Sequence, residues 1–279
     1  MLLRARAHPA SWPHSLFGRH HPGYATAWNT LITSAANPRL KLVRKLSARR
    51  QRDKLGLFVC EGEDLVAAGL DAGLEPVEAL VDAERPALRD RLPRAEEVAS
   101  ELIAEVSTLA HSPRVIAVFR RADLRRGVDA PVGLGLWQLA DPGNVGTLVR
   151  TADALGPAFV ALSPGCADPT SPKALRASMG AVFRVPLASF DDAPRPWIGL
   201  VPRDGRPLPE LELGRPVTFI LGSEREGLPE DVAARCDDLA SIPLAPSAES
   251  LNVAAAGAIA LYERWCREQK HRSASSVAS

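Results

Sequence analysis

A run of small and polar residues between positions 141 and 150 (DPGNVGTLVR) is the first candidate for chemistry in this sequence. Pro142 and Gly143 predict a tight turn, and Gly146 would permit another backbone to approach closely. The run follows an apolar segment and leads into a helical pattern, and α/β proteins bind ligands at such strand ends. Arg150 is therefore a candidate ligand-binding cation; a buried arginine with structural hydrogen bonds is the alternative.

The relative placement of Asn144 and Arg150 depends on where the helix begins. The two residues are six positions apart, which corresponds to about 600° of rotation along an α-helix. They would lie on different faces if both were helical. We therefore expect Asn144 in the turn before the helix and Arg150 about two turns into it.

Two further segments could cooperate with this run. Residues 219–228 (FILGSEREGL) place an apolar strand directly before a loop that contains Gly222 and the carboxylate of Glu224. Ile242-Pro243-Leu244 precedes residues 250–256 (SLNVAAA), in which Ser250 is a natural helix N-cap and the alanines allow close packing. Taken singly, each segment also fits an ordinary strand end or a capped helix.

The distribution of histidine and cysteine argues against several kinds of catalysis. No histidine lies between residues 112 and 270, which disfavours a Ser-His-Asp hydrolase, a cysteine–histidine pair and a histidine-ligated catalytic zinc there. The sequence has neither a GxSxG nor a GxxxxGK(S/T) motif. The four cysteines form no CxxC pair, so we predict no metal site and the reduced thiols of a cytoplasmic protein.

Apolar periodicity predicts a small α/β region in the first part of the chain. Residues 37–54 are expected to form a basic helix with Asn37 as N-cap and Pro38 at its first position. Strands that alternate with helices then follow. The predicted strands are 57–60, 77–81 and 115–119, and the predicted helices are 64–72 and 95–106.

A second and longer alternation begins at Leu134. Its apolar strands, separated by helices, predict a mostly parallel sheet that is covered on both faces. The predicted strands are 134–139, 158–162, 182–187, 197–201, 217–221 and 241–244, and the predicted helices are 143–155, 172–179, 228–235 and 251–267.

Charge is distributed unevenly, although the formal net charge of the whole chain is +1. Residues 1–54 contain eleven Lys or Arg and one acid, which suggests an arm that binds a polyanion; a solvated basic tail is the alternative. The first thirty residues weakly resemble a transit peptide but lack a secretory signal, and no apolar run is long enough to span a membrane. We divide the chain into a disordered extension (1–30), a small α/β domain (31–122), a linker (123–132), a larger α/β domain (133–270) and a disordered tail (271–279).

In this order and spacing, the three segments resemble the SpoU (TrmH-type) branch of the SPOUT methyltransferases, which methylate ribose 2′-hydroxyls in tRNA or rRNA. The resemblance covers about residues 135–267. Residues 37–120 resemble the L30e-like substrate-binding domain that is often joined to it, through Asn37-Pro38-Arg39 and residues 58–62 (FVCEG). The chain departs from the family at Ala245-Pro246, where a glycine is common.

The resemblance implies an α/β fold with a deep trefoil knot near the C-terminus, one of the rare exceptions to unknotted topology. It implies S-adenosyl-L-methionine as the cofactor, held in a bent form chiefly by backbone groups of the knot loops. It also implies a homodimer through the knotted domain, which the alanine-rich start of the last helix fits. The cofactor-binding positions carried over are Leu221, Gly222, Ile242, Leu244 and Leu251.

The catalytic positions carried over from the family are Asn144, Arg150, Glu224, Ser250 and Asn252. The resemblance implies that the nucleophile is the 2′-hydroxyl of the RNA itself and that Arg150 is the candidate for activating it. An arginine stays protonated in proteins, so stabilisation of the developing alkoxide and a nearby phosphate is the alternative role. The two asparagines and Ser250 would position the ribose and Arg150, and Glu224 would hold its loop or orient a partner.

The basic segment supplies the predicted RNA contacts, which are Arg39, Lys41, Arg44, Arg49, Arg50 and Arg52. Large-subunit rRNA is favoured over tRNA as the substrate, by analogy with the accessory domain alone. Two functions of other classes stay open: an RNA-binding protein that keeps the fold without catalysis, and a nucleotide-dependent oxidoreductase. For the latter, Gly143 and Gly146 form only a partial dinucleotide fingerprint.

Overall fold

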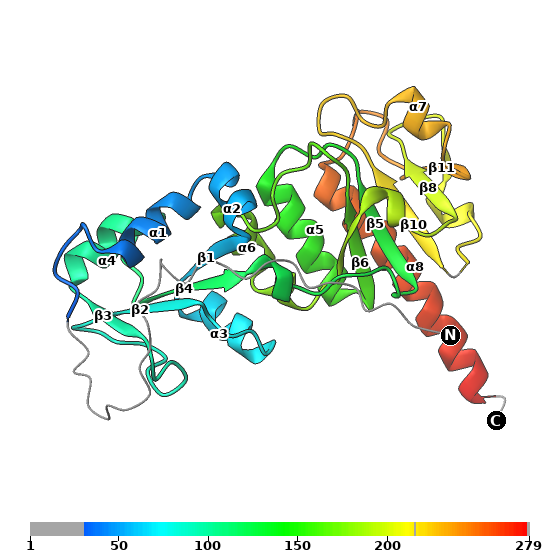
Figure 1. The fold of residues 1–279 in the computed structure, drawn as a ribbon. Coiled ribbons are helices and arrows are strands. Elements are labelled where there is room, and N and C mark those ends of the chain that lie inside the picture. The colour runs from blue at the N-terminus through cyan, green and yellow to red at the C-terminus, as the bar shows by residue number, and fades with distance from the viewer. Residues whose placement is uncertain (1–30, 215, 278–279) are drawn as a thin grey trace, which may run out of the picture. The chain divides into compact units, whose positions relative to one another are not determined.

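The computed structural model describes residues 31–214 and 216–277 (Figure 1). These residues belong to one compact unit. The predicted disordered extension (1–30) and the last two residues of the predicted tail lie outside the described residues. Among the helices that are described, none is long and apolar enough to cross a membrane.

A small domain with a mixed sheet opens the described chain. Its strands are β1 (Leu57–Glu61), β2 (Glu78–Asp82), β3 (Glu96–Val98) and β4 (Val115–Arg120), and its helices are α1 (Pro38–Leu46), α2 (Arg49–Leu55), α3 (Glu63–Asp71) and α4 (Ser100–Val106). The strand order is β1-β4-β2-β3; β4 is antiparallel to β1 and β2, and β3 is parallel to β2. The side chain of Asn37 accepts a hydrogen bond from the backbone N–H of Arg39, so Asn37 caps α1 as predicted.

Two predicted helices of this domain are wrong in extent. The predicted helix 37–54 is interrupted at Ser47 and Ala48, because the backbone of Ala48 is extended and α2 starts anew after it. The predicted helix 95–106 begins instead with β3, which pairs with β2. The sequence pattern of a three-residue strand is too short to reveal such a pairing, and the hydrogen bonds of the partner strand decide the backbone conformation.

The larger domain contains a sheet of seven parallel strands. Its strands are β5 (Val132–Leu136), β6 (Ala158–Leu162), β7 (Leu187–Ser189), β8 (Trp197–Leu200), β9 (Arg206–Pro207), β10 (Val217–Leu221) and β11 (Asp238–Ser241). Its α-helices are α5 (Pro142–Ala154), α6 (Pro172–Ser178), α7 (Glu230–Ala233) and α8 (Val253–Val277). The strand order is β7-β6-β5-β10-β8-β11-β9, and each neighbouring pair is parallel. The parallel α/β architecture predicted from the sequence is thereby confirmed.

Several boundaries in this domain differ from the prediction. Residues 182–187 are not one strand: a 3-10 turn (Ala181–Phe183) comes first and β7 starts at Leu187. The predicted strand 241–244 is β11, which ends at Ser241, so Ile242 and Leu244 lie in the following loop. In both places apolar residues such as Val182 and Ile242 pack in or against the core without belonging to a strand. Apolar periodicity alone does not distinguish such residues from strand residues.

The predicted linker and the predicted C-terminal tail are also more regular than expected. β5 begins within the linker at Val132, and Arg126 forms a parallel bridge with Leu187. α8 continues to Val277, past the predicted end at Arg267 and through most of the predicted tail. Extending a helix that already exists adds one hydrogen bond per residue at little cost, whereas nucleating a new one is unfavourable.

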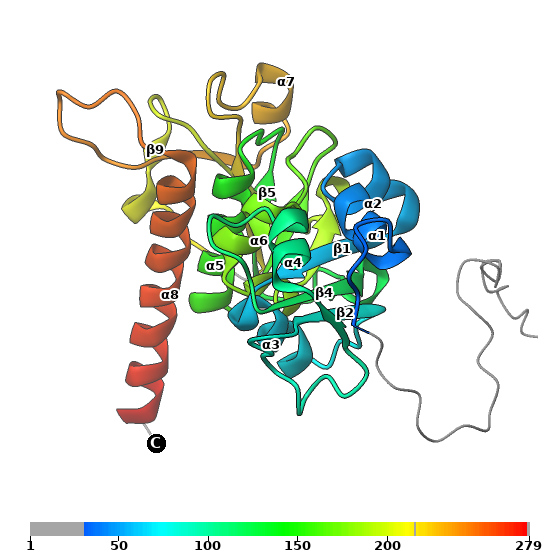
Figure 2. The same cartoon turned by 90° about the vertical axis from the view of Figure 1, so that its left-hand side faces the viewer.

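The helix that follows β5 is central to the packing of the larger domain. α5 packs against both α6 and α8, and α8 runs beside it along the edge of the domain (Figure 2). Gly146 explains the close approach of α6: a Cβ atom at this position would lie 2.3 Å from the carbonyl oxygen of Ala174. The spacing of small residues in the run 141–150 therefore fixes where α5 sits, and with it the residues at its first turn.

Candidate active site

The three segments singled out from the sequence meet at the carboxyl ends of two adjacent strands. β5 and β10 are neighbours, with Leu136 opposite Leu221 at the ends of both. The loop that leads into α5 and the loop that follows β10 therefore leave the sheet side by side. This is the edge at which parallel α/β sheets bind ligands.

Glu224 joins these two loops. Its carboxylate accepts hydrogen bonds from the backbone N–H groups of Ala140 (3.2 Å) and Asp141 (3.1 Å) and from Nδ2 of Asn144 (3.0 Å). Partial burial raises the pKa of Glu224, but the hydrogen bonds from Asn144 and the backbone outweigh it, so the pKa lies below its ordinary value. At neutral pH Glu224 is a carboxylate that anchors the β10 loop to the start of α5.

Asn144 lies inside α5 and not in the turn before it, which corrects the prediction from the sequence. The reason is that Asp141 is the N-cap: its Oδ1 accepts hydrogen bonds from the backbone N–H groups of Gly143 (2.5 Å) and Asn144 (3.1 Å), and Pro142 occupies the first helical position. Within the first turn, Asn144 presents its amide nitrogen to Glu224 and its oxygen to Asn252.

Asn252 connects the third segment to the other two. Its Nδ2 donates a hydrogen bond to Oδ1 of Asn144 at 3.2 Å. Its own Oδ1 accepts hydrogen bonds from the backbone N–H groups of Ala254 (2.8 Å) and Ala255 (3.3 Å), so Asn252 caps α8. The predicted N-cap, Ser250, is wrong, because α8 begins at Val253 and Ser250 lies in the exposed loop before it.

Arg150 and Ser250 are not joined to this network by any contact recorded among the described residues. Arg150 is exposed on α5, and no hydrogen bond or ion pair is recorded for its guanidinium. With Asn144 also helical, the two residues are separated by about 600° of rotation and lie on different faces of α5. The structure thus assembles Asn144, Glu224 and Asn252, and leaves Arg150 as an exposed cation about one and two-thirds turns further along the helix.

The predicted cofactor-binding residues lie at the end of β10, beyond the end of β11 and just before α8. Leu221 is buried at the end of β10, Ile242 and Leu244 are half-buried beyond the end of β11, and Leu251 is exposed. At Gly222 a Cβ atom would lie 2.0 Å from the backbone of Gly227. Ser223 and Gly227 exchange two backbone hydrogen bonds of 3.0 Å, which closes this loop tightly. A turn that admits only glycine at position 222 presents backbone groups rather than side chains, which is the chemistry that a cofactor held by backbone groups would require.

Lys173 is a residue of this site that the sequence did not reveal. Its Nζ donates a hydrogen bond to Oδ2 of Asp141 at 2.7 Å, and this bond, together with the capped backbone, holds the pKa of Asp141 below its ordinary value. Lys173 reaches the site from α6, and only the packing of α6 on α5 brings it there. No group of three or more His, Cys, Asp or Glu that could hold a metal ion is found among the residues that the structure describes.

The predicted RNA-contact residues fall into three groups. Lys41 and Arg50 are exposed and form no ion pair with a described residue. Arg39, Arg44 and Arg49 form ion pairs with carboxylates, and Arg49 also donates a hydrogen bond to a backbone carbonyl oxygen. Arg52 is 3% exposed and donates from Nε to Asp168 at 2.7 Å. Arg52 is therefore corrected from an RNA contact to a structural residue, because its guanidinium has no face open to a phosphate.

Comparison with known proteins extends over both domains. Residues 131–262 match the SpoU rRNA Methylase family, and residues 37–117 match the MRM3-like substrate binding domain. The chain is 35% identical, over 83% of its length and 92% of the relative's, to an uncharacterized tRNA/rRNA methyltransferase of Synechocystis sp.. It is 32% identical, over 83% of its length and 97% of the relative's, to the 23S rRNA (guanosine(2553)-2'-O)-methyltransferase RlmP of Bacillus subtilis.

A solved structure shares the fold. The AdoMet-bound rRNA methyltransferase from Sinorhizobium meliloti aligns with a TM-score of 0.74 and 28% identity, over 84% of this chain and 96% of that one. The family match contains Asn144, Glu224 and Asn252, which the structure joins by hydrogen bonds. The chain therefore belongs to the SpoU family of rRNA methylases and carries an MRM3-like substrate-binding domain before the methylase domain.

Proposed function

We propose that this protein transfers the methyl group of S-adenosyl-L-methionine to a ribose 2′-hydroxyl of large-subunit ribosomal RNA. One observation carries the proposal: Glu224, Asn144 and Asn252, from three separate segments, are joined by hydrogen bonds at the end of β5 and β10. A relative with 32% identity over nearly all its length is a 23S rRNA 2′-O-methyltransferase, which favours rRNA over tRNA and a site of action in the cytoplasm.

The cofactor supplies an activated methyl group on a sulfonium when it is bound. The chain's part is to hold the two reactants in line, because positioning accounts for much of the barrier in such a transfer. The loops around Gly222 and around Ile242–Leu244 would hold the cofactor through their backbone. The loops after β10 and β11 would cross as the trefoil knot that the family resemblance implies.

The hydrogen-bonded asparagines are the groups proposed to orient the ribose. The Asn144 side chain is held from both ends, by Glu224 and by Asn252, so its rotamer is fixed before substrate binds. Arg150, exposed and without a recorded carboxylate partner, is proposed to stabilise the alkoxide that forms as the hydroxyl reacts, and a nearby phosphate. The hydroxyl proton leaves to water or to phosphate.

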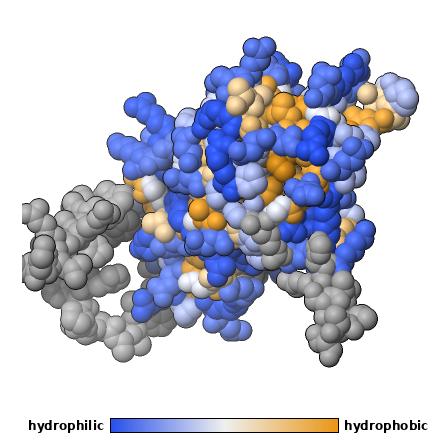
Figure 3. All heavy atoms as spheres, turned by 90° about the vertical axis from the view of Figure 1, so that its right-hand side faces the viewer, coloured by the Kyte–Doolittle hydropathy of each residue, from blue (hydrophilic) through white to orange (hydrophobic). Residues whose placement is uncertain are grey.

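We further propose that the protein is a homodimer through the methylase domain. Ile259, Tyr262 and Trp265 of α8 are 39%, 56% and 37% exposed, although they are large and apolar or aromatic. Figure 3 views the molecule from the side on which the methylase domain lies in Figure 1, and it shows apolar surface among polar residues. Sedimentation equilibrium tests this: a Tyr262→Asp variant should be monomeric where the unmodified protein is dimeric, and a monomeric unmodified protein would refute the dimer.

Methyl transfer to purified ribosomal RNA tests the proposed function directly. The protein is incubated with S-adenosylmethionine labelled in the methyl group and with rRNA that lacks its natural modifications, and ribose methylation is mapped. Incorporation at a single 2′-hydroxyl of the large-subunit RNA is expected. Binding of the RNA without incorporation would instead favour a non-catalytic RNA-binding protein, and stabilisation by NAD but not by S-adenosylhomocysteine would favour an oxidoreductase.

A further inference from the structure

A buried ion cluster joins the substrate-binding domain to the methylase domain. Asp168 follows β6 in the methylase domain and is 7% exposed. Its Oδ2 accepts hydrogen bonds from Nε of Arg52 in α2 (2.7 Å) and from Nη2 of Arg121 after β4 (2.5 Å). Burial raises the pKa of Asp168, but hydrogen bonds from Thr170 and the two arginines outweigh it, so the pKa lies below its ordinary value. The cluster is charged at neutral pH.

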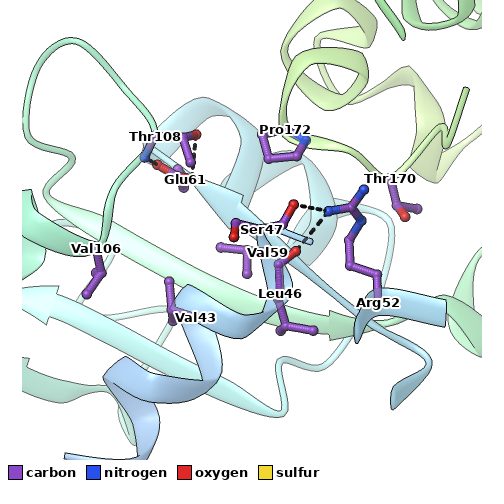
Figure 4. A pocket seen from close by; sticks show the side chains of 10 residues that line it. All are labelled: Val43, Leu46, Ser47, Arg52, Val59, Glu61, Val106, Thr108, Thr170 and Pro172. Atoms are coloured by element: carbon purple, nitrogen blue, oxygen red, sulfur yellow. Dashed lines mark hydrogen bonds between the residues drawn. The ribbon is translucent and has the colours of Figure 1, made fainter. Parts of the chain in front are cut away.

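The two arginines hold defined parts of the substrate-binding domain. Nη1 of Arg52 donates to the carbonyl oxygens of Leu46 and Ser47, at the turn between α1 and α2, at 2.9 and 2.7 Å. Figure 4 shows this guanidinium between the turn and Thr170, at the edge of a small cavity that both domains line. Nearby, Arg49 of α2 donates to the carbonyl oxygen of Cys166 at 2.9 Å. The basic helix α2 is thus fastened to the loop that carries Asp168.

The same loop is fastened on its other side to the active site. The backbone N–H of Ala167 donates to the carbonyl oxygen of Leu139 at 2.7 Å, and Ser163 Oγ accepts from the backbone N–H of Gln138 at 2.9 Å. Leu139 directly precedes Ala140 and Asp141, whose backbone N–H groups bind Glu224. Hydrogen bonds joined by short stretches of backbone therefore connect α2 through Asp168 to the loop that positions Asn144.

Apolar packing also joins the two domains, but it depends less on direction than the hydrogen bonds do. Phe58 and Phe119 of the substrate-binding domain contact Phe183 of the methylase domain, with ring centroids 6.3 and 6.0 Å apart. Aromatic pairs accept both stacked and edge-to-face arrangements, whereas hydrogen bonds weaken steeply when their angle departs from linear. The ion cluster at Asp168 is a buried charged contact between the two domains, and with the hydrogen bonds from Arg49 to Cys166 and from Arg176 to Thr108 it constrains their angle and spacing.

We propose that Asp168 is a positioning residue that selects which ribose is methylated, by fixing the substrate-binding domain relative to the active site. The inference rests on the proposed function. RNA bound along α1 and α2 reaches the active site at a distance that the Asp168 cluster sets. Because a misplacement of about 1 Å can cost on the order of 10²-fold in rate, a rigid connection presents one nucleotide and excludes its neighbours.

The test compares Asp168→Asn with Asp82→Asn on a long rRNA fragment. Asp82 is a matched control: it is a fully buried carboxylate that accepts from Ser100 Oγ and from the backbone N–H of Glu84, all within the substrate-binding domain. For Asp168→Asn we expect methylation to spread to nucleotides beside the principal site and kcat to fall at least about tenfold. Affinity for S-adenosylhomocysteine should stay within about twofold, since no cofactor loop is touched. Asp82→Asn should lower stability without moving the methylated position.

A second variant covers the case in which Asp168→Asn does not fold. Arg121 is 20% exposed in its side chain, and Arg121→Gln removes one of the two bonds to Asp168 Oδ2 while Arg52 stays in place. It should give the same spread of methylation in milder form, and Arg121→Lys should restore part of the selectivity. If the variants that fold methylate the same single nucleotide at an unchanged kcat per folded molecule, the inference is overturned. A spread in Asp82→Asn as well would overturn it too, whereas an unmodified protein that transfers no methyl group would refute the proposed function itself.

Discussion

The carboxylate of Glu224 accepts a hydrogen bond from Nδ2 of Asn144 at 3.0 Å, across 80 positions of sequence. The same carboxylate binds the backbone N–H of Asp141, which caps the helix that carries Asn144. The Glu224 carboxylate therefore holds both the side chain of Asn144 and the start of α5. Asn252 closes the arrangement from the opposite side, and its own cap ties the network to α8.

Replacing Glu224 with glutamine tests the anion at the centre of this network. Three N–H donors converge on the carboxylate, and the amide group of glutamine would direct its own N–H toward them. We expect methyl transfer to fall about tenfold or more, equivalent to about 1.4 kcal/mol of barrier. Glu226→Gln, an exposed neighbour with no side-chain hydrogen bond recorded among the described residues, is the control.

Glu224 also predicts a pH dependence of stability. Its pKa is lowered in the folded protein, so its stabilising contribution is present above the unfolded pKa of about 4.3 and is lost as the pH falls through the folded value. Unfolding by urea should show a smaller loss of stability below about pH 4.3 in Glu224→Gln than in the unmodified protein. Identical acid profiles would contradict the depressed pKa.

Asn252 has two roles that substitutions can separate. Asn252→Ala removes the cap of α8, which should reduce stability by about 1 kcal/mol, and removes the donor to Asn144 as well. Asn252→Ser keeps a capping oxygen but cannot reach Asn144 in the same way. We expect both variants to lose transfer and only Asn252→Ala to lose stability in urea titrations. Normal turnover by Asn252→Ser would show that the contact with Asn144 is dispensable.

Gly222 tests the proposed cofactor loop. A Cβ atom at this position would lie 2.0 Å from the backbone of Gly227, so Gly222→Ala must displace the loop after β10. We expect affinity for S-adenosylhomocysteine, measured by calorimetry, to fall at least about tenfold, which corresponds to about 1.4 kcal/mol. Gly214→Ala is the matched control, because a Cβ atom there meets nothing within 4 Å. Equal affinities in the two variants would place the cofactor elsewhere.

Substitutions of Arg150 distinguish a role in methyl transfer from a role in cofactor binding. Arg150→Ala should reduce methyl transfer on the order of 10²-fold, as removal of a group that stabilises a developing oxyanion does. Arg150→Lys should recover part of the rate, because a cation at the same position can still stabilise an alkoxide. Affinity for S-adenosylhomocysteine should change by no more than a few-fold in either variant. Near-normal turnover in Arg150→Ala would remove this residue from the mechanism.

The exposed basic residues of α1 and α2 predict a salt dependence. Deleting the whole basic segment would remove the buried Leu40, Val43 and Leu46, so substitutions are the sharper test. Lys41 and Arg50 are exposed, and so is Lys54 of α2. Replacing these three residues together with alanine should reduce the slope of log Kd against log salt by about 2 to 3 units. The charge-preserving set Lys41→Arg, Arg50→Lys and Lys54→Arg should leave the slope unchanged. An unchanged slope in the alanine set would show that these residues are solvated and do not contact RNA.

The sequence by itself determined the class of fold and the identity of the chemical segments. Apolar strands such as Val217–Leu221 and the capped start of α1 at Asn37 were predicted correctly, because their signals are local: periodicity and the turn chemistry of Asn, Pro and Gly. The resemblance to the SpoU family rested on residue types in order along the chain, and the comparisons confirmed it.

Only the tertiary structure decided how these residues act together. Ser250 and Asn252 are both good capping residues, and Asn252, which also donates to Asn144 of α5, is the one that caps α8. Arg52 belongs to a basic run like its neighbours, yet Asp168, 116 positions away, removes it from the surface. Lys173 carries no signal at all in the sequence. In each case the deciding partner is distant along the chain, so its effect is a matter of packing and electrostatics that no local pattern encodes.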